Sequence, residues 1–203
     1  MKRLAILGGT FDPVHYGHLG LAAAARRSLG LDTVIFMPAG RPWMKEGRAV
    51  TAPASRAAML ARATRGRPGY HLSRLEVARP GPSYTRDSLA QVREKLAPED
   101  ELYFILSWQT LAELPRWYQP AEVIRLCRLA VAPRPGASRP DLAVLEKALP
   151  GISNRVVWLE MPPRDISATG IRRRAARGEN LTGLVPPAVA AYIREQGLYG
   201  AGL

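Results

Sequence analysis

The chain has very few of the residues from which proteins build disulfides and zinc sites. It carries one cysteine and three histidines among 203 residues. A lone Cys127 excludes an internal disulfide and favours a reducing compartment, so we expect a cytoplasmic protein. The spacing of His15, His18, His71 and Cys127 matches no zinc motif, and we therefore expect no metal ion held by the protein itself.

Long apolar runs and two common nucleotide-binding fingerprints are also missing. No stretch approaches the ~20 apolar residues of a membrane helix, and the apolar run 4–7 is too short for a signal peptide. The dinucleotide pattern GxGxxG and the P-loop pattern GxxxxGKS/T are both absent. These absences argue against a membrane protein, a dinucleotide oxidoreductase and a P-loop NTPase.

Acidic residues and lysine are scarce. The chain has 17 acidic and 29 basic residues, of which 25 are arginine, and its formal net charge is +12. A bias toward GC-rich codons can produce the excess of arginine without any functional pressure. The charge favours anionic partners such as ATP and mononucleotides. A nucleic-acid-binding module is the rival interpretation, but the basic residues are scattered and match no known module, so we expect no nucleic-acid partner.

Strand-like and helix-like segments alternate along the chain. Extended segments are expected at 4–8, 33–37, 70–77, 101–106, 129–132 and 155–159. Helices are expected at 17–29, 54–63, 84–96, 141–149, 167–177 and 186–196, with short helical pieces between 109 and 126. This alternation predicts an α/β, Rossmann-like fold, a parallel sheet with helices on both faces.

The segment 8–19, GGTFDPVHYGHL, joins the first expected strand to the first expected helix. The start of a helix exposes unpaired N–H groups and attracts phosphate. Gly8 and Gly9 let the backbone approach a bulky anion, and His15 and His18 are close enough to reach one anionic group. The alternative is that the two histidines merely cap an ordinary helix.

This segment resembles the signature of HxGH-type nucleotidyltransferases, and the longer match resembles nicotinate mononucleotide adenylyltransferases. Residues 166–172, ISATGIR, are similar to that family's ISSTxIR block, with Ala168 in place of the second serine. The resemblance implies a single nucleotidyltransferase domain over 1–203, with the C-terminal helices at 167–199 packed on it. It implies an ATP site formed by Gly8, Gly9, Thr10, Phe11, His15, His18, Gln109, Ser167, Thr169 and Arg172.

Two further segments resemble the family's acceptor site. Residues 82–85, PSYT, are similar to a segment whose backbone amides near Tyr84 and Thr85 receive the nicotinate carboxylate. Residues 114–118, LPRWY, are similar to the element whose tryptophan, here Trp117, stacks on the pyridine ring. Taken alone, residues 82–85 would be interpreted as a turn with a helix cap, and Trp117 as a residue of the core.

The chain departs from the family pattern after the fourth expected strand. The family has Gly-x-Asp there, with the aspartate on the adenosine ribose, whereas this chain has Ser107-Trp108-Gln109. Gln109 keeps hydrogen-bonding capacity but not the charge. In a Pro-rich loop, Lys45 matches the family's phosphate-binding lysine, although Met44 replaces the histidine before it.

The resemblance implies adenylyl transfer from ATP to nicotinate mononucleotide, which gives deamido-NAD and pyrophosphate. His18, His15, Lys45 and Arg172 would carry catalysis, and Mg²⁺ would arrive with ATP. The alternatives are an adenylyltransferase for another phosphorylated acceptor, such as phosphopantetheine, and a nucleotide-binding relative without turnover. Homo-oligomerisation is left open.

Overall fold

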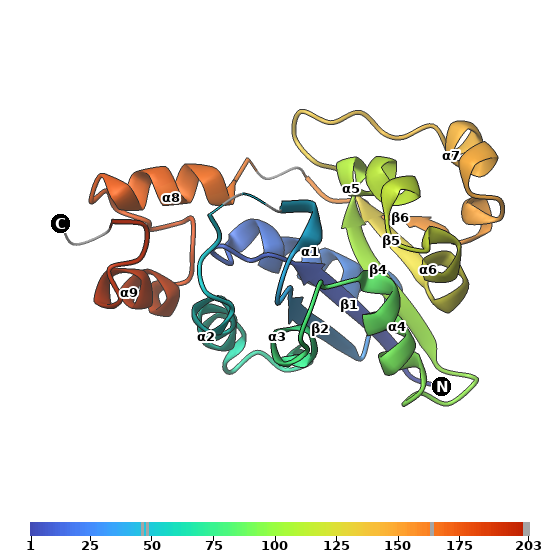
Figure 1. The fold of residues 1–203 in the computed structure, drawn as a ribbon, viewed down its shortest axis with the longest axis horizontal. Coiled ribbons are helices and arrows are strands. Elements are labelled where there is room, and N and C mark those ends of the chain that lie inside the picture. The colour runs from blue at the N-terminus through green and yellow to red at the C-terminus, as the bar shows by residue number, and fades with distance from the viewer. Residues whose placement is uncertain (46, 48, 163–164, 201–203) are drawn as a thin grey trace.

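A six-stranded parallel sheet forms the centre of the computed structural model, which describes residues 1–45, 47, 49–162 and 165–200 (Figure 1). The strands are β1 (Arg3–Gly9), β2 (Thr33–Pro38), β3 (Tyr70–Leu72), β4 (Glu101–Ser107), β5 (Arg128–Ala132) and β6 (Val156–Trp158). Their order is β3-β2-β1-β4-β5-β6. The chain builds outward from β1 in one direction and from β4 in the other. Ligands bind in such sheets at the carboxyl ends of the two strands where this reversal occurs.

Helices connect consecutive strands and continue past β6. They are α1 (Tyr16–Leu29), α2 (Pro53–Thr64), α3 (Leu75–Ala78), α4 (Thr85–Arg93), α5 (Trp108–Glu113), α6 (Pro120–Leu126), α7 (Leu142–Ala148), α8 (Ala168–Ala176) and α9 (Pro187–Glu195). Short 3₁₀ turns lie at η1 (Trp43–Lys45), η2 (Leu114–Arg116), η3 (Ile152–Asn154) and η4 (Leu198–Gly200). In the part of the chain that the structure describes, no helix combines the length and apolarity needed to cross a membrane.

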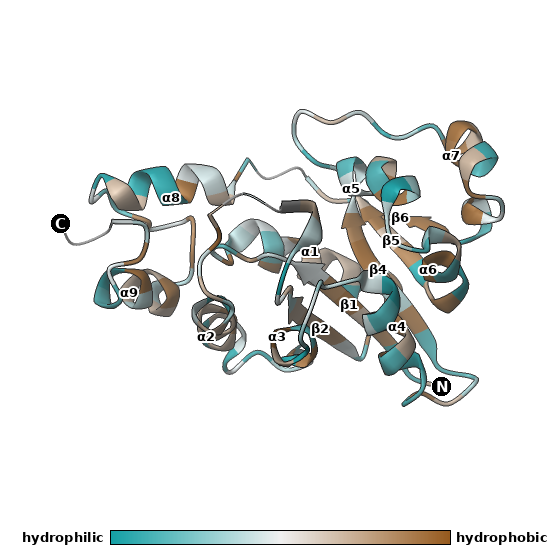
Figure 2. Cartoon of the chain, in the orientation of Figure 1, coloured by the Kyte–Doolittle hydropathy of each residue, from teal (hydrophilic) through white to brown (hydrophobic). Residues whose placement is uncertain are grey.

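Strands β1, β2, β4, β5 and β6 contribute to two apolar clusters because their side chains alternate between the faces of the sheet. Ala5 and Leu7 join the cluster that contains residues of α1, α2, α8 and α9, whereas Ile6 joins the cluster of α4–α7. The strands are correspondingly brown in Figure 2, where the outer faces of several helices are teal. This arrangement confirms the predicted α/β, Rossmann-like fold with helices on both faces.

The prediction of an extended segment over 70–77 is wrong beyond Leu72. Strand β3 ends there, and residues Leu75–Ala78 form the single helical turn α3. Leu75 packs against the second cluster, and the neighbouring Glu76 bonds to Ser88 in α4. A turn of four residues is too short to show a helical period, so long-range contacts decide its conformation.

Candidate active site

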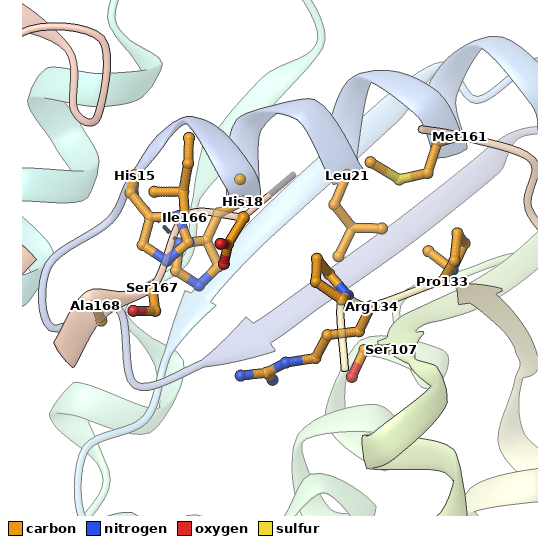
Figure 3. Close-up of a pocket in the computed structure, with 14 residues that line it drawn as sticks. His15, His18, Leu21, Ser107, Pro133, Arg134, Met161, Ile166, Ser167 and Ala168 are labelled. Carbon is orange, nitrogen blue, oxygen red and sulfur yellow. Dashed lines mark hydrogen bonds between the residues drawn. The ribbon is translucent and has the colours of Figure 1, made fainter. Parts of the chain in front are cut away.

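A cavity of about 340 Å³ opens at the carboxyl ends of β1, β4 and β5 (Figure 3). The start of α1, the end of β4, the segment after β5 and the start of α8 all contribute to it. Its lining consists of His15, Gly17, His18, Leu21, Ser107, Ala132, Pro133, Arg134, Pro135, Met161, Asp165, Ile166, Ser167 and Ala168. The two sequence motifs, which are about 150 residues apart in the chain, therefore meet at one cavity.

His18 is oriented by the backbone of the loop that carries it. The His15 N–H donates to Nδ1 of His18 at 3.3 Å. Because Nδ1 accepts this bond, the proton of the neutral ring is on Nε2, which makes Nε2 a donor. The imidazole also lies 4.9 Å from the ring of Phe11 and 3.8 Å from that of His15. The cavity thus has a donor whose ring is held on several sides.

His15 is neutral at neutral pH. It is 7% exposed, and its buried Nδ1 has no protein partner among the described residues. Burial, helped by the nearby charge of Arg134, lowers the pKa of His15 from 6.5 to about 4. The two neighbouring imidazoles therefore approach each other without repulsion between charges.

Arg134 supplies a positive charge that the sequence analysis missed. It follows β5 and lines the cavity, and in Figure 3 its guanidinium extends toward the two imidazoles. An arginine directly after a parallel strand is the signal that could have found it, since strand carboxyl ends meet at such sites. The position of β5 next to β4 was needed to use that signal.

The start of α8 forms another wall. Ser167 caps the helix by accepting from the Gly170 N–H at 3.1 Å, and it lines the cavity. Arg172 donates from Nη1 to the carbonyl oxygen of Asp12 at 2.8 Å and from Nη2 to Thr169 Oγ1 at 3.4 Å. Arg172 thus joins α8 to the β1–α1 loop in this structure, and neither Arg172 nor Thr169 is among the lining residues.

The buried side chain of Arg56 holds the β1–α1 loop in place through hydrogen bonds to the backbone. Arg56 is fully buried and donates to the carbonyl oxygens of Thr51, Thr10 and Gly40, at 2.8, 2.8 and 3.2 Å. Burial lowers the pKa of Arg56, while the negative charge of Asp12 opposes that shift. The guanidinium therefore connects three segments of the chain.

Asp12 ties the same loop to the far end of the chain. Its buried carboxylate accepts from the Thr51 N–H at 3.1 Å and from the Tyr199 hydroxyl at 2.6 Å. Phe11, the residue before it, has a left-handed φ of 52°, which is uncommon for a bulky residue and needs support from its surroundings. These contacts supply that support and keep the Phe11 ring against His18.

Gly8 and Gly9, the last two residues of β1, have different surroundings from those expected. A Cβ on Gly8 would lie 3.0 Å from the Phe104 ring, and one on Gly9 would lie 3.4 Å from the Phe11 ring. Neither glycine lines the cavity. The absent side chains therefore make room for aromatic packing beneath the loop, and direct approach to an anion stays a prediction for both residues, as it does for Thr10.

A pair of stacked aromatic rings brings the predicted acceptor residues near one another. Tyr84 precedes the first residue of α4, Thr85, and its ring stacks on that of Tyr118 at 4.4 Å. Trp117 is half-buried, packs edge-on against Phe104 at 6.0 Å, and has no partner for Nε1 in the described part of the chain. The structure thus brings the start of α4 beside the segment 114–118, and it adds Tyr118 to the aromatic surface there.

Of the predicted ATP-site residues, His15, His18 and Ser167 line the cavity, whereas Gly8, Gly9, Thr10, Phe11, Gln109, Thr169 and Arg172 do not. Gln109 is exposed, donates to Glu113 Oε1 at 3.2 Å, and does not line the cavity, whereas Ser107 does. Ser107 caps α5 by accepting from the Thr110 N–H. Lys45 ends η1, and its side chain lies outside the described residues.

The residues at the cavity are suited to phosphates more than to a resident metal. Among the described residues, no group of three or more His, Cys, Asp or Glu side chains could hold a metal ion. Asp165 is the only carboxylate among the described residues that line the cavity.

Comparison with known proteins gives one consistent result. Residues 6–174 match the cytidylyltransferase-like family. A Dehalococcoides mccartyi protein named "Probable nicotinate-nucleotide adenylyltransferase" is 44% identical over 197 residues, 97% of each chain. A Thermomicrobium roseum protein of the same name is 42% identical over 98% of this chain and 92% of its own.

A solved structure supports the fold. The Plasmodium falciparum nicotinic acid mononucleotide adenylyltransferase complexed with NaAD superimposes with a TM-score of 0.80, covering 100% of this chain and 99% of that one at 18% identity. At this identity the likeness concerns the fold alone, whereas the sequence relatives extend over almost the whole chain. The chain therefore belongs to the nicotinate-nucleotide adenylyltransferase family, within the cytidylyltransferase-like proteins.

Proposed function

We propose that this protein transfers the adenylyl group of ATP to nicotinate mononucleotide, a step of NAD biosynthesis that yields deamido-NAD and pyrophosphate. The observation that carries the proposal is the oriented pair His15 and His18, which faces a cavity at the carboxyl ends of β1 and β4 beside Arg134. The family relatives named above have this activity in their names.

The reaction needs positioning and charge stabilisation and no covalent enzyme intermediate. An oxygen of the acceptor phosphate attacks the α-phosphorus of ATP in line and forms the new P–O bond. The bond to the β-phosphate oxygen breaks, and pyrophosphate leaves with the electron pair. The nucleophile is already ionised at neutral pH, so no side chain has to remove a proton from it.

His18 is proposed to stabilise the negative charge that builds up on the α-phosphate. Its Nε2–H is the donor left by the bond at Nδ1, and such a donor is oriented before the reaction starts. Arg134 adds positive charge, and neutral His15 adds a ring nitrogen. Mg²⁺ bound to ATP would neutralise part of the phosphate charge, and Lys45 and Arg172 stay predicted phosphate ligands.

The start of α4 is proposed to recognise the carboxylate of the pyridine ring. The N–H groups at Tyr84 and Thr85 belong to the first turn of a nine-residue helix, where unpaired donors attract an anion. Trp117 and the stacked pair Tyr84 and Tyr118 provide apolar surface for the ring. A carboxamide would present its own N–H₂ to these donors.

One assay tests the proposal and its rivals. The protein is incubated with ATP, Mg²⁺ and one acceptor at a time, namely nicotinate mononucleotide, nicotinamide mononucleotide or phosphopantetheine, and pyrophosphate release is followed. Release with nicotinate mononucleotide supports the proposal. Release with phosphopantetheine alone assigns another adenylyltransferase activity, and binding of ATP without release with any acceptor indicates a non-catalytic relative.

A further inference from the structure

Glu76 is a buried carboxylate outside the cavity for which the proposed chemistry has no use. It is 8% exposed and lies in α3, the turn that the sequence did not predict. Its Oε1 accepts from the Ser88 hydroxyl at 2.6 Å. Burial raises the pKa of Glu76, while bonds from Ser88 and Ser83 and the charge of Arg79 act in the opposite direction. Because burial of a carboxylate costs free energy, we expect Glu76 to have a structural or functional role.

Ser83 connects Glu76 to the loop that follows β2. Its hydroxyl oxygen accepts from the Gly40 N–H at 2.9 Å and from the Arg41 N–H at 3.2 Å. The side chain of Ser83 also interacts with the Glu76 carboxylate and acts to lower the pKa of Glu76. The Ser83 N–H also donates to the Arg41 carbonyl oxygen at 2.8 Å.

The loop after β2 and the backbone of α3 approach so closely that only glycine fits at position 40. A Cβ at this position would lie 2.1 Å from the carbonyl oxygen of Glu76. The loop after β2 therefore packs directly on the backbone of α3. Trp43, further along this loop, reaches the Tyr84 ring at 5.9 Å. The position of the loop and that of Tyr84 are thus coupled.

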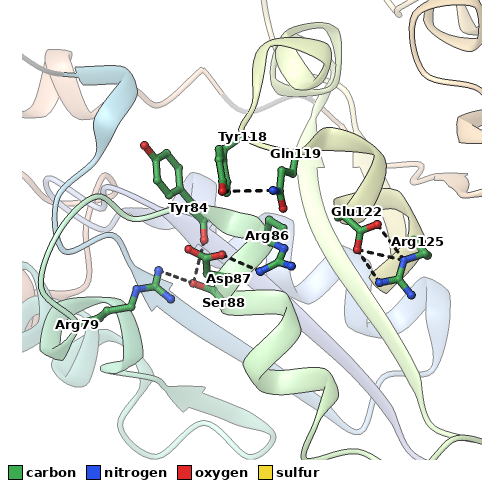
Figure 4. Close-up of polar contacts among 9 residues, drawn as sticks. All are labelled: Arg79, Tyr84, Arg86, Asp87, Ser88, Tyr118, Gln119, Glu122 and Arg125. Carbon is green, nitrogen blue, oxygen red and sulfur yellow. Dashed lines mark hydrogen bonds and ion pairs between the residues drawn. The ribbon is translucent and has the colours of Figure 1, made fainter.

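Ser88 connects Glu76 to α4 from the other side. Its hydroxyl accepts from Nη2 of Arg79 at 3.2 Å, and its N–H donates to the Tyr84 carbonyl oxygen (Figure 4). Ser83 and Ser88 stand on either side of Tyr84 and Thr85 in the sequence. The Glu76 carboxylate therefore bonds to Ser88 at one end of the segment that carries the proposed acceptor donors, and it interacts with Ser83 at the other end.

Building on the proposed function, we propose that Glu76 is a positioning residue for the acceptor. Its carboxylate sets the distance between the start of α4 and the loop after β2, and so aims the N–H groups at Tyr84 and Thr85 at the carboxylate of the pyridine ring. Glu76 touches no substrate in this role. Its loss should weaken acceptor binding while leaving the ATP side, built on β1, β5 and α8, unchanged.

The test compares Glu76→Gln and Glu76→Ala with a control glutamate. Glu146 in α7 accepts from the Gly151 N–H and from the N–H and hydroxyl of Ser153, so Glu146→Ala also removes a loop-holding carboxylate. KM is measured separately for nicotinate mononucleotide and ATP, and melting temperature is recorded for every variant. We expect Glu76→Ala to raise the KM for the mononucleotide at least about tenfold and the KM for ATP less than about twofold.

Glu76→Gln keeps the shape and one acceptor oxygen, so its effect should be intermediate, and Glu146→Ala should leave both constants unchanged. A rise in both KM values to the same extent, or no rise in a folded Glu76 variant, would overturn the positioning role while leaving the proposed function intact. An inactive wild-type protein would overturn both. If Glu76→Ala does not fold, the positioning role is tested with Glu76→Gln alone, by whether the KM for nicotinate mononucleotide rises more than the KM for ATP.

Discussion

Replacing His18 separates its two roles, orienting the loop and stabilising the reacting phosphate. His18→Asn leaves a side-chain oxygen that can accept the His15 N–H but removes the donor at Nε2. Loss of an oriented donor to a transition-state oxyanion costs about 3–4 kcal/mol, so kcat should fall roughly 10²–10³-fold. His18→Ala removes the cap bond as well, and should also cost about 1 kcal/mol of stability.

The assay is pyrophosphate release at saturating ATP and nicotinate mononucleotide, with thermal unfolding of each variant. His71→Asn is the matched control, because His71 is an exposed residue of β3 away from the cavity. We expect His71→Asn to keep full activity and His18→Asn to keep a near-native melting temperature with little activity. A folded His18→Asn protein whose kcat stays within about threefold of wild type would refute the catalytic assignment.

Four further predictions concern His15, the acceptor, the buried Asp12 carboxylate and Gln109. The folded pKa of His15, about 4, lies below its unfolded value of 6.5, so the unfolded state binds the extra proton between these values. Stability should therefore fall, on the order of 3 kcal/mol, as pH drops from 6.5 to 4, and urea unfolding of His15→Asn should lack this component. Nicotinate mononucleotide should exceed nicotinamide mononucleotide in kcat/KM by at least about tenfold, and equal values would mean that α4 does not read the carboxylate. Tyr199→Phe leaves the buried Asp12 carboxylate short of one donor at a cost of about 2 kcal/mol, and an unchanged melting temperature would contradict this. Gln109→Asp should lower the KM for ATP severalfold, since a carboxylate bonds a ribose hydroxyl about 1 kcal/mol more strongly, and an unchanged KM would show that residue 109 does not reach the ribose.

The sequence predicted features that depend on neighbouring residues. The strand, loop and helix around His15 and His18 follow from glycine and apolar patterning within about twenty residues, and Ser167 is a cap that acts on its own helix. The parallel sheet with helices on both faces followed from the alternation of strands and helices along the chain. Such local signals were sufficient for the fold class, and they also singled out His15, His18 and Ser167, which line the cavity.

The features that were missed depend on contacts between distant segments. Arg134 reaches the cavity only because β5 lies beside β4, and α3 forms because Glu76 finds Ser83 and Ser88 later in the chain. The bond from Arg172 to Asp12 spans 160 residues, and no local pattern signals it. Burial and hydrogen bonding at this range become visible only once the elements are assembled.

The hydrogen bond between Asp12 and Tyr199 has a consequence for how the protein matures on the ribosome. The two residues are 187 positions apart, so the loop with both imidazoles is synthesised well before the hydroxyl that anchors it. The N-terminal part of a chain leaves the ribosome before the part that follows is made. A nascent chain that already contains β1, α1 and the full sheet still lacks the hydroxyl that anchors the loop, and it should bind nucleotide poorly. Competence for the reaction would then appear only after the helices that follow the sheet have left the exit tunnel.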